Sequence, residues 1–99
     1  ADTAFVARAR SHNATWRDWL CERLRRIGLA VDESFGNFVL ARFAGAQAAN
    51  AADDFLKSRG LIVRRMGAYH LPEALRITIG QEDELRELVN ALEAHLGQA

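Results

Sequence analysis

The sequence contains few residues of several kinds, and each shortage narrows what the protein can be. It has one proline and one cysteine among 99 residues, while 49% of its residues are apolar. A chain of this composition is neither disordered nor low in complexity. The single cysteine, Cys21, excludes an internal disulfide and favours a reduced, cytoplasmic setting. Cys21 lies beside Leu20 and Leu24 in a helical pattern, which indicates a packing role.

Excess charge and long apolar runs are also missing. Thirteen basic and thirteen acidic residues give a formal net charge of zero, which argues against a nucleic-acid partner because such proteins usually carry a basic excess. No apolar run approaches the ~18 residues of a membrane-spanning helix, and no signal peptide is visible. The chain begins at Ala1 rather than at a methionine, which processing or a start inside a longer protein would explain equally well.

Hydrophobic spacing predicts three helices and four short strands. Apolar residues recur at intervals of three and four in each helical segment, and a glycine follows each one. The predicted helices are residues 5–27, 46–59 and 82–96. β-Branched, aromatic and alternating stretches predict the strands. These are residues 29–31, 38–43, 61–65 and 75–79, with a connection at residues 66–73.

This order predicts an α+β fold in one domain spanning residues 1–99. Three helices would cover one face of a small sheet of three to four strands, antiparallel or mixed. We place the strand at residues 75–79 between those at 38–43 and 61–65, antiparallel to both. The first helix is long for a chain of this size, which suggests that it spans two domains.

The sequence gives little support for a metal site or for a complete catalytic site. His12, His70 and His95 are scattered without a paired ligand at metal-binding spacing. His12 and His95 lie on or beside apolar stripes and are interpreted as packing or surface residues. No nucleophile elbow and no glycine-rich phosphate loop is present.

Two arginines suggest an anion site instead. Arg76 lies mid-strand in an alternating run, facing away from Leu75 and Ile77. Arg64 lies on the strand expected to be its neighbour. Arginine binds carboxylate or phosphate well because its planar guanidinium donates two parallel hydrogen bonds. The alternative is that each arginine pairs with a local acid or extends to solvent at a sheet edge. Arg42 and Arg65 are interpreted as solvated or structural.

The same segments resemble a known family. Residues 34–40 (SFGNFVL), 55–64 (FLKSRGLIVR) and 71–80 (LPEALRITIG) are similar, in order, to the C-terminal part of histidinol-phosphate aminotransferases. These enzymes are fold-type I transaminases that depend on pyridoxal 5'-phosphate. The similarity extends over essentially the whole chain, and the LRITIG segment is its most specific part.

The resemblance implies roles for both arginines. Arg76 would bind the α-carboxylate of the substrate, and Arg64 would bind near its phosphate end. The chain would be the C-terminal small domain of the enzyme, whose partners are the absent large, cofactor-binding domain and an amino-acid or phosphate substrate.

One departure from the family limits that role. The family holds its cofactor through a Schiff-base lysine upstream of the region matched here, and Lys57, the only lysine, lies on an amphipathic helix as a solvated residue. We therefore expect no catalytic residue, no bound cofactor and no bound metal in this chain, which alone would be inactive. Gln81 stands where a threonine is common, so the last helix is expected to begin less firmly.

Other interpretations stay open at this stage. The chain could be a stand-alone, non-catalytic anion-binding or regulatory module. It could also belong to an aromatic aminotransferase or a threonine-phosphate decarboxylase of the same superfamily. Trp16, Trp19 and Met66 are expected to be uncovered without a large domain. Because exposed apolar patches favour association, a homo-oligomer is predicted, with no nucleic-acid or membrane partner.

Overall fold

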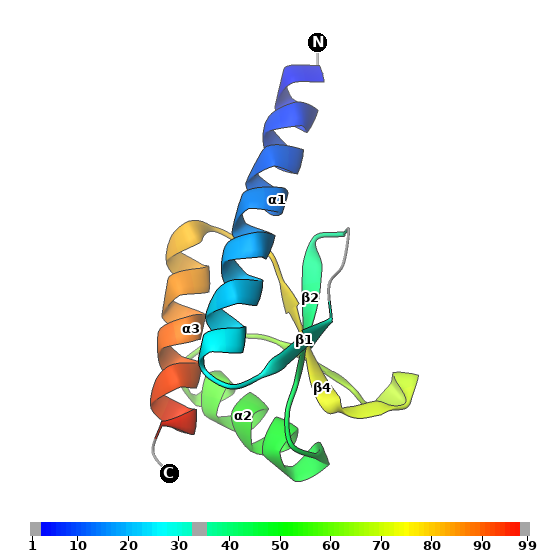
Figure 1. The fold of residues 1–99 in the computed structure, drawn as a ribbon, viewed down its shortest axis with the longest axis vertical. Coiled ribbons are helices and arrows are strands. Elements are labelled where there is room, and N and C mark those ends of the chain that lie inside the picture. The colour runs from blue at the N-terminus through cyan, green and yellow to red at the C-terminus, as the bar shows by residue number, and fades with distance from the viewer. Residues whose placement is uncertain (1–2, 33–35, 98–99) are drawn as a thin grey trace.

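The computed structural model describes residues 3–32 and 36–97 and confirms an α+β fold (Figure 1). These residues form three helices and four strands, with two strands between one helix and the next. They are α1 (Thr3–Arg26), β1 (Ala30–Asp32), β2 (Phe38–Arg42), α2 (Ala46–Ser58), β3 (Arg64–Met66), β4 (Leu71–Thr78) and α3 (Glu82–Leu96). A single 3₁₀ turn, Gly67–Tyr69, connects β3 to β4.

The four strands form one antiparallel sheet in the order β1-β2-β4-β3. β4 therefore lies between β2 and β3 and runs antiparallel to both, as the sequence predicted. Leu40 of β2 and Arg64 of β3 both stand opposite Arg76 of β4. Since residues directly opposite each other share a face, these three side chains lie on the same side of the sheet.

The helices cover only the other face of the sheet. Val39, Ala41, Leu75 and Ile77 alternate with the residues of the first face and are buried against the helices. Helix α1 contributes Leu20, Cys21 and Leu24 to the same core, which confirms the packing role of Cys21. The face that carries Arg76 has no helix over it in the described chain (Figure 1).

Two glycines end helices in the left-handed conformation. Gly28 has φ +99°, and its N–H donates to the carbonyl of Arg25 at 3.1 Å while Leu29 donates to Leu24 at 3.1 Å. This pair of bonds is the Schellman arrangement, which an added Cβ would strain. Gly60 ends α2 in the same way, with φ +77°.

The predicted strand at residues 61–65 was too long at its start. The N–H of Leu61 donates to the carbonyl of Leu56 at 2.9 Å, closing the end of α2, and the chain joins the sheet only at Arg64. Ile62 is left 81% exposed. A run of β-branched residues therefore overstated the strand, because the helix cap fixes its first residue outside the sheet.

The connection predicted at residues 66–73 was also partly wrong. β4 begins at Leu71 and includes Pro72. Proline lacks an N–H for the ladder, but here the register shifts between Arg65 and Met66, so regular pairing is already interrupted beside it. Met66 is buried rather than uncovered, contrary to prediction. Among the side chains that the structure describes, the large exposed apolar ones are Ile62 and, at 60%, Tyr69.

Helix α3 begins with an acceptor from its own first turn. The N–H of Gln81 donates to Glu84 Oε1 at 3.0 Å. Glu82, Asp83 and Glu84 all lie in that turn, where negative charge suits the positive end of the helix dipole. This end therefore has the carboxylate half of a capping box despite glutamine at position 81.

The N-terminal half of α1 extends beyond the rest of the fold (Figure 1). The molecule measures 48 × 27 × 23 Å along its principal axes, and the 24 residues of α1, roughly 36 Å of helix, make up most of its long dimension. Trp16 and Trp19 are half-buried rather than uncovered, and the Arg86 guanidinium lies 5.4 and 5.3 Å from their ring centroids. No helix in the described residues has the length and apolarity to cross a membrane.

Candidate functional site

Arg76 lies at the centre of the uncovered face of the sheet. It is the sixth residue of β4, between the buried side chains of Leu75 and Ile77, and is itself half-buried. Its guanidinium carbon lies 4.2 Å from the centroid of the Phe38 ring on β2. This cation–π contact holds the guanidinium against the strand that neighbours β4. Sequence reasoning missed Phe38, although its alternation with Val39 already placed it on this face.

Arg64 stands directly opposite Arg76 on β3, which confirms that the two strands are neighbours. Both side chains line a hollow of about 210 Å³, together with Ile62, Val63 and Thr78. Two like charges facing each other across a strand pair repel. No carboxylate in the described residues forms an ion pair with either arginine. The hollow is therefore lined by two arginines that have no ion-pair partner among the described carboxylates.

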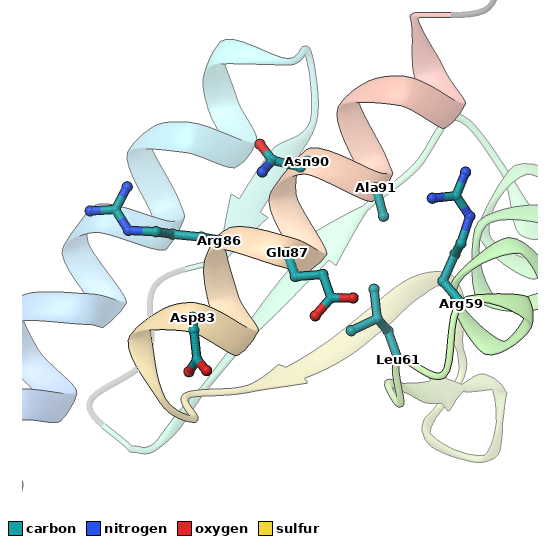
Figure 2. A pocket seen from close by; sticks show the side chains of 7 residues that line it. All are labelled: Arg59, Leu61, Asp83, Arg86, Glu87, Asn90 and Ala91. Carbon is teal, nitrogen blue, oxygen red and sulfur yellow. The ribbon is translucent and has the colours of Figure 1, made fainter.

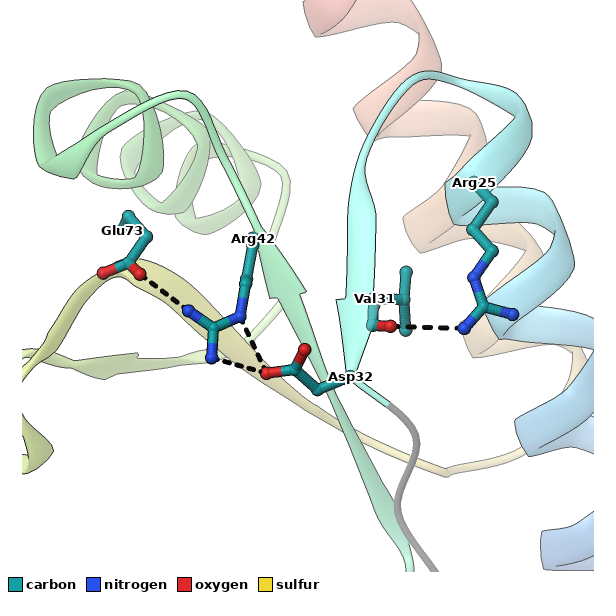
Figure 3. A network of polar contacts seen from close by, with 5 residues as sticks. All are labelled: Arg25, Val31, Asp32, Arg42 and Glu73. Atoms are coloured by element: carbon teal, nitrogen blue, oxygen red, sulfur yellow. Dashed lines mark hydrogen bonds and ion pairs between the residues drawn. The ribbon is translucent and has the colours of Figure 1, made fainter.

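Arg42, on the same face, has carboxylate partners (Figure 3). Its guanidinium lies 2.6 Å from Asp32 and 2.7 Å from Glu73, so it joins β1, β2 and β4. Figure 3 also shows Arg25 donating to the carbonyl of Val31 at 3.2 Å, at the outer edge of β1. The prediction that Arg42 is structural is confirmed.

Arg65 points to the helical face and is also paired. Its Nε donates to Asp53 Oδ2 at 2.5 Å, and its NH2 group lies 2.9 Å from Asp54. Asp53 is 1% exposed, and Lys57 Nζ lies 3.2 Å from the same oxygen. The adjacent residues Arg64 and Arg65 thus differ sharply, because strand alternation sends one to an open hollow and the other to a buried carboxylate.

The two paired arginines have raised pKa values. The hydrogen bond to Asp53 raises the pKa of Arg65, and the hydrogen bond to Asp32 raises the pKa of Arg42. A raised pKa on a cation means that its pairing stabilises the fold fully at pH values below the ordinary arginine pKa, as long as the partner carboxylate is ionised. The contribution is lost as the pH rises through the raised value. Neither pair therefore responds to pH in the neutral range.

A second hollow is lined by residues of both charges, unlike the hollow of Arg64 and Arg76. It measures about 410 Å³ and lies between α3 and the segment after α2 (Figure 2). Arg59 lines it, but so do Asp83 and Glu87. Arg86 points toward α1 in Figure 2 and bonds Glu82 at 2.9 Å. Acidic residues offset the arginines here, unlike in the hollow of Arg64 and Arg76.

The remaining candidate side chains have structural surroundings. His12 Nε2 lies 2.8 Å from the carbonyl of Gly80, so that nitrogen carries the proton and ties α1 to the start of α3. The His95 ring stacks on Phe55 with centroids 4.8 Å apart. Both contacts agree with packing roles. Within the described residues, no three histidine, cysteine or acidic side chains gather in a metal-binding group.

Comparison with known proteins defines the class. The sequence profile of the family "Aminotransferase class I and II" matches residues 1–92, and the chain belongs to this family. The family depends on pyridoxal 5'-phosphate.

Within this family, the chain is similar to histidinol-phosphate aminotransferases. The chain is 50% identical over 98 residues to histidinol-phosphate aminotransferase of Dinoroseobacter shibae, covering 99% of this chain and 27% of that protein. It is 54% identical over 93 residues to the histidinol-phosphate aminotransferase of Ruegeria pomeroyi, covering 94% and 26%. The chain thus spans about a quarter of the length of these relatives.

Solved structures agree with the fold. A protein of Burkholderia pseudomallei assigned as an aminotransferase superposes with a TM-score of 0.80 at 31% identity, over 87% of this chain and 26% of that one. Aspartate aminotransferase of Thermotoga maritima superposes with a TM-score of 0.76 at 15% identity, over 98% and 25%. The second likeness concerns the fold alone.

The described residues do not fit a lysine-held cofactor. Lys57 is the only lysine of the chain, and it forms its ion pair with Asp53 on the helical side of the sheet. Arg64 and Arg76 lie on the opposite face. No step of cofactor chemistry can therefore be assigned to side chains of this chain.

Proposed function

We propose that this chain is the small, substrate-binding domain of a transaminase of the histidinol-phosphate type. Arg76 binds the α-carboxylate of the substrate, and Arg64 binds nearer its phosphate end. The complete enzyme transfers an amino group between an amino-phosphate substrate and glutamate or 2-oxoglutarate. A large domain, outside this chain, carries the cofactor.

One observation carries the proposal. Arg64 and Arg76 face each other across β3 and β4, and no acid in the described residues pairs with them. Every other arginine on these two strands or on β2 has a carboxylate partner. An oxyanion between the two guanidinium groups would relieve their repulsion and accept charge-assisted hydrogen bonds from both.

Anion binding tests the site. Isothermal titration of the purified chain with inorganic phosphate should give saturable binding that Arg76→Gln weakens about tenfold or more, since it removes hydrogen bonds to a charged group. Arg26→Gln is the matched control, because it removes the same charge from an exposed site on α1. Equal losses in the two variants would mean that only net charge matters, and the site would be wrong.

Catalysis by the chain alone is expected to be absent. With pyridoxal 5'-phosphate, glutamate and an imidazole-containing keto phosphate supplied, the purified chain should show no transamination, because Lys57 is held by Asp53. Reverse-phase separation of glutamate and 2-oxoglutarate measures this. Turnover above that of an Arg76→Gln control would contradict the assignment of the chemistry to another domain.

A further inference from the structure

The sheet has a gap beside the end of β4. β3 pairs with β4 from Arg64, opposite Arg76, and continuing this antiparallel register would place Ile62 opposite Thr78. Residues 61–63 have nevertheless left the sheet. No backbone hydrogen bond joins Ile62 to Thr78 in the part of the chain that the structure describes. The last residue of β4 therefore has no strand beside it on this side.

The backbone of Thr78 faces that gap. The N–H of the next residue, Ile79, donates to Asn37 at 2.7 Å on the β2 side. Successive residues of a strand direct their N–H and C=O groups to opposite sides. Those of Thr78 therefore point to the β3 side, while its side chain shares the uncovered face with Arg76. Thr78 supplies a hydroxyl and an N–H donor in the hollow that Arg64 and Arg76 line.

Two hollows meet at this gap. The hollow of Arg64 and Arg76 is bounded by Ile62 and Thr78. A third hollow, of about 290 Å³, is also lined by Ile62 and Thr78. The rest of its wall is mostly apolar and comes from the end of α2, the end of β4 and α3: Gly60, Leu61, Ile77, Gly80, Glu84, Leu85 and Leu88. The two hollows adjoin at their shared residues, and the larger of the two, at about 290 Å³, is close to the lower bound of small-molecule sites, roughly 300 Å³.

The two ends of this joined hollow differ in charge. One end has two arginines, and the only charged residue that lines the other is Glu84, which accepts from the N–H of Gln81. An anionic group is therefore attracted to the arginine end and repelled from the apolar end. Ile62 lines both hollows, and 81% of its surface is exposed, so its side chain is accessible to a bound molecule.

We propose that the joined hollow binds an organic oxyanion whose body is apolar, and that Ile62 selects for that body. The anionic group lies between Arg64 and Arg76 and accepts from Thr78, while the uncharged remainder covers Ile62 at the gap. This inference rests on the proposed function, since it needs the arginine site. It adds a preference for amphiphilic over small inorganic anions.

A series of phosphate monoesters tests the preference. Titrations with inorganic, methyl and butyl phosphate separate the anionic group from the apolar body. Butyl phosphate has three more methylenes than methyl phosphate, and we expect it to bind about tenfold more tightly. This is roughly twofold per methylene, below the roughly fourfold gain for a fully buried one, because Ile62 is a partly open wall. Ile62→Ser should remove this difference between the two esters.

Tyr69→Ser is the matched control. Tyr69 is the other large exposed apolar residue in the described chain, and it lines neither hollow. The difference between the esters should survive in this variant. Equal binding of methyl and butyl phosphate, or a difference that survives Ile62→Ser, overturns the inference while leaving the arginine site in place. Absence of binding by all three compounds overturns the arginine site and this inference together.

Discussion

Arg76 and Phe38 show how a single contact prepares a binding group. The Arg76 side chain has four flexible torsions, and ordering it on a ligand costs conformational entropy. The Phe38 ring lies 4.2 Å from its guanidinium carbon and holds the group before any anion arrives. In the proposed site, Phe38 would act on binding through Arg76 rather than by touching the ligand.

Replacing the ring should weaken binding modestly. Phe38→Leu keeps an apolar side chain but removes the ring quadrupole, so phosphate affinity should fall about two- to fivefold, the size of an exposed cation–π contact. Phe38→Tyr should retain wild-type affinity. Calorimetric titration measures both, and circular dichroism checks that the fold is kept. Unchanged affinity in the leucine variant would show that Arg76 needs no support from Phe38.

At the scale of elements, the adjacent residues Arg64 and Arg65 of β3 lie on opposite faces of the sheet and have different roles. Arg65 faces α2 and neutralises Asp53, whose Oδ1 atom is buried without a hydrogen-bond partner in the described residues. Arg64 faces the uncovered side opposite Arg76. A buried carboxylate is costly once its partner is removed, whereas removing one of two facing like charges is not.

Alanine at these neighbouring positions should therefore have opposite effects. Arg65→Ala should lower the Tm by roughly 5–10 °C, because Lys57 alone is left to pair with Asp53. Arg64→Ala should leave the Tm unchanged or raise it slightly. Thermal unfolding in phosphate-free buffer measures both. Equal destabilisation by the two variants would contradict the separation of roles along β3.

Much of this arrangement was predictable from sequence. Alternation around Arg76 and the placement of β4 between its neighbours together brought Arg64 and Arg76 to one face. The start of β3 was harder to predict, because the Schellman turn at Gly60 keeps Leu61 out of the sheet. The register shift between Arg65 and Met66 cannot be read from the sequence, so the burial of Met66 was not predicted. Phe38 and Ile62 required knowledge of which residues end up beside the arginines.

At the scale of the molecule, the fold leaves one face of its sheet without helices. The chain spans about a quarter of its aminotransferase relatives. The bare face, the arginine hollow and the projecting half of α1 support the proposal that this chain works against a larger domain. Self-association of this chain stays a prediction. Its basis is smaller than expected, because Met66 is buried and both tryptophans are half-covered.

The most direct measurement is an NMR titration of the arginine side-chain Nε–Hε resonances with inorganic phosphate. We predict that the resonances of Arg64 and Arg76 shift together and saturate. Those of Arg42 and Arg65, which already pair with carboxylates, should stay in place. A stationary Arg76 resonance, or equal shifts in all four arginines, would contradict an anion site built from Arg64 and Arg76.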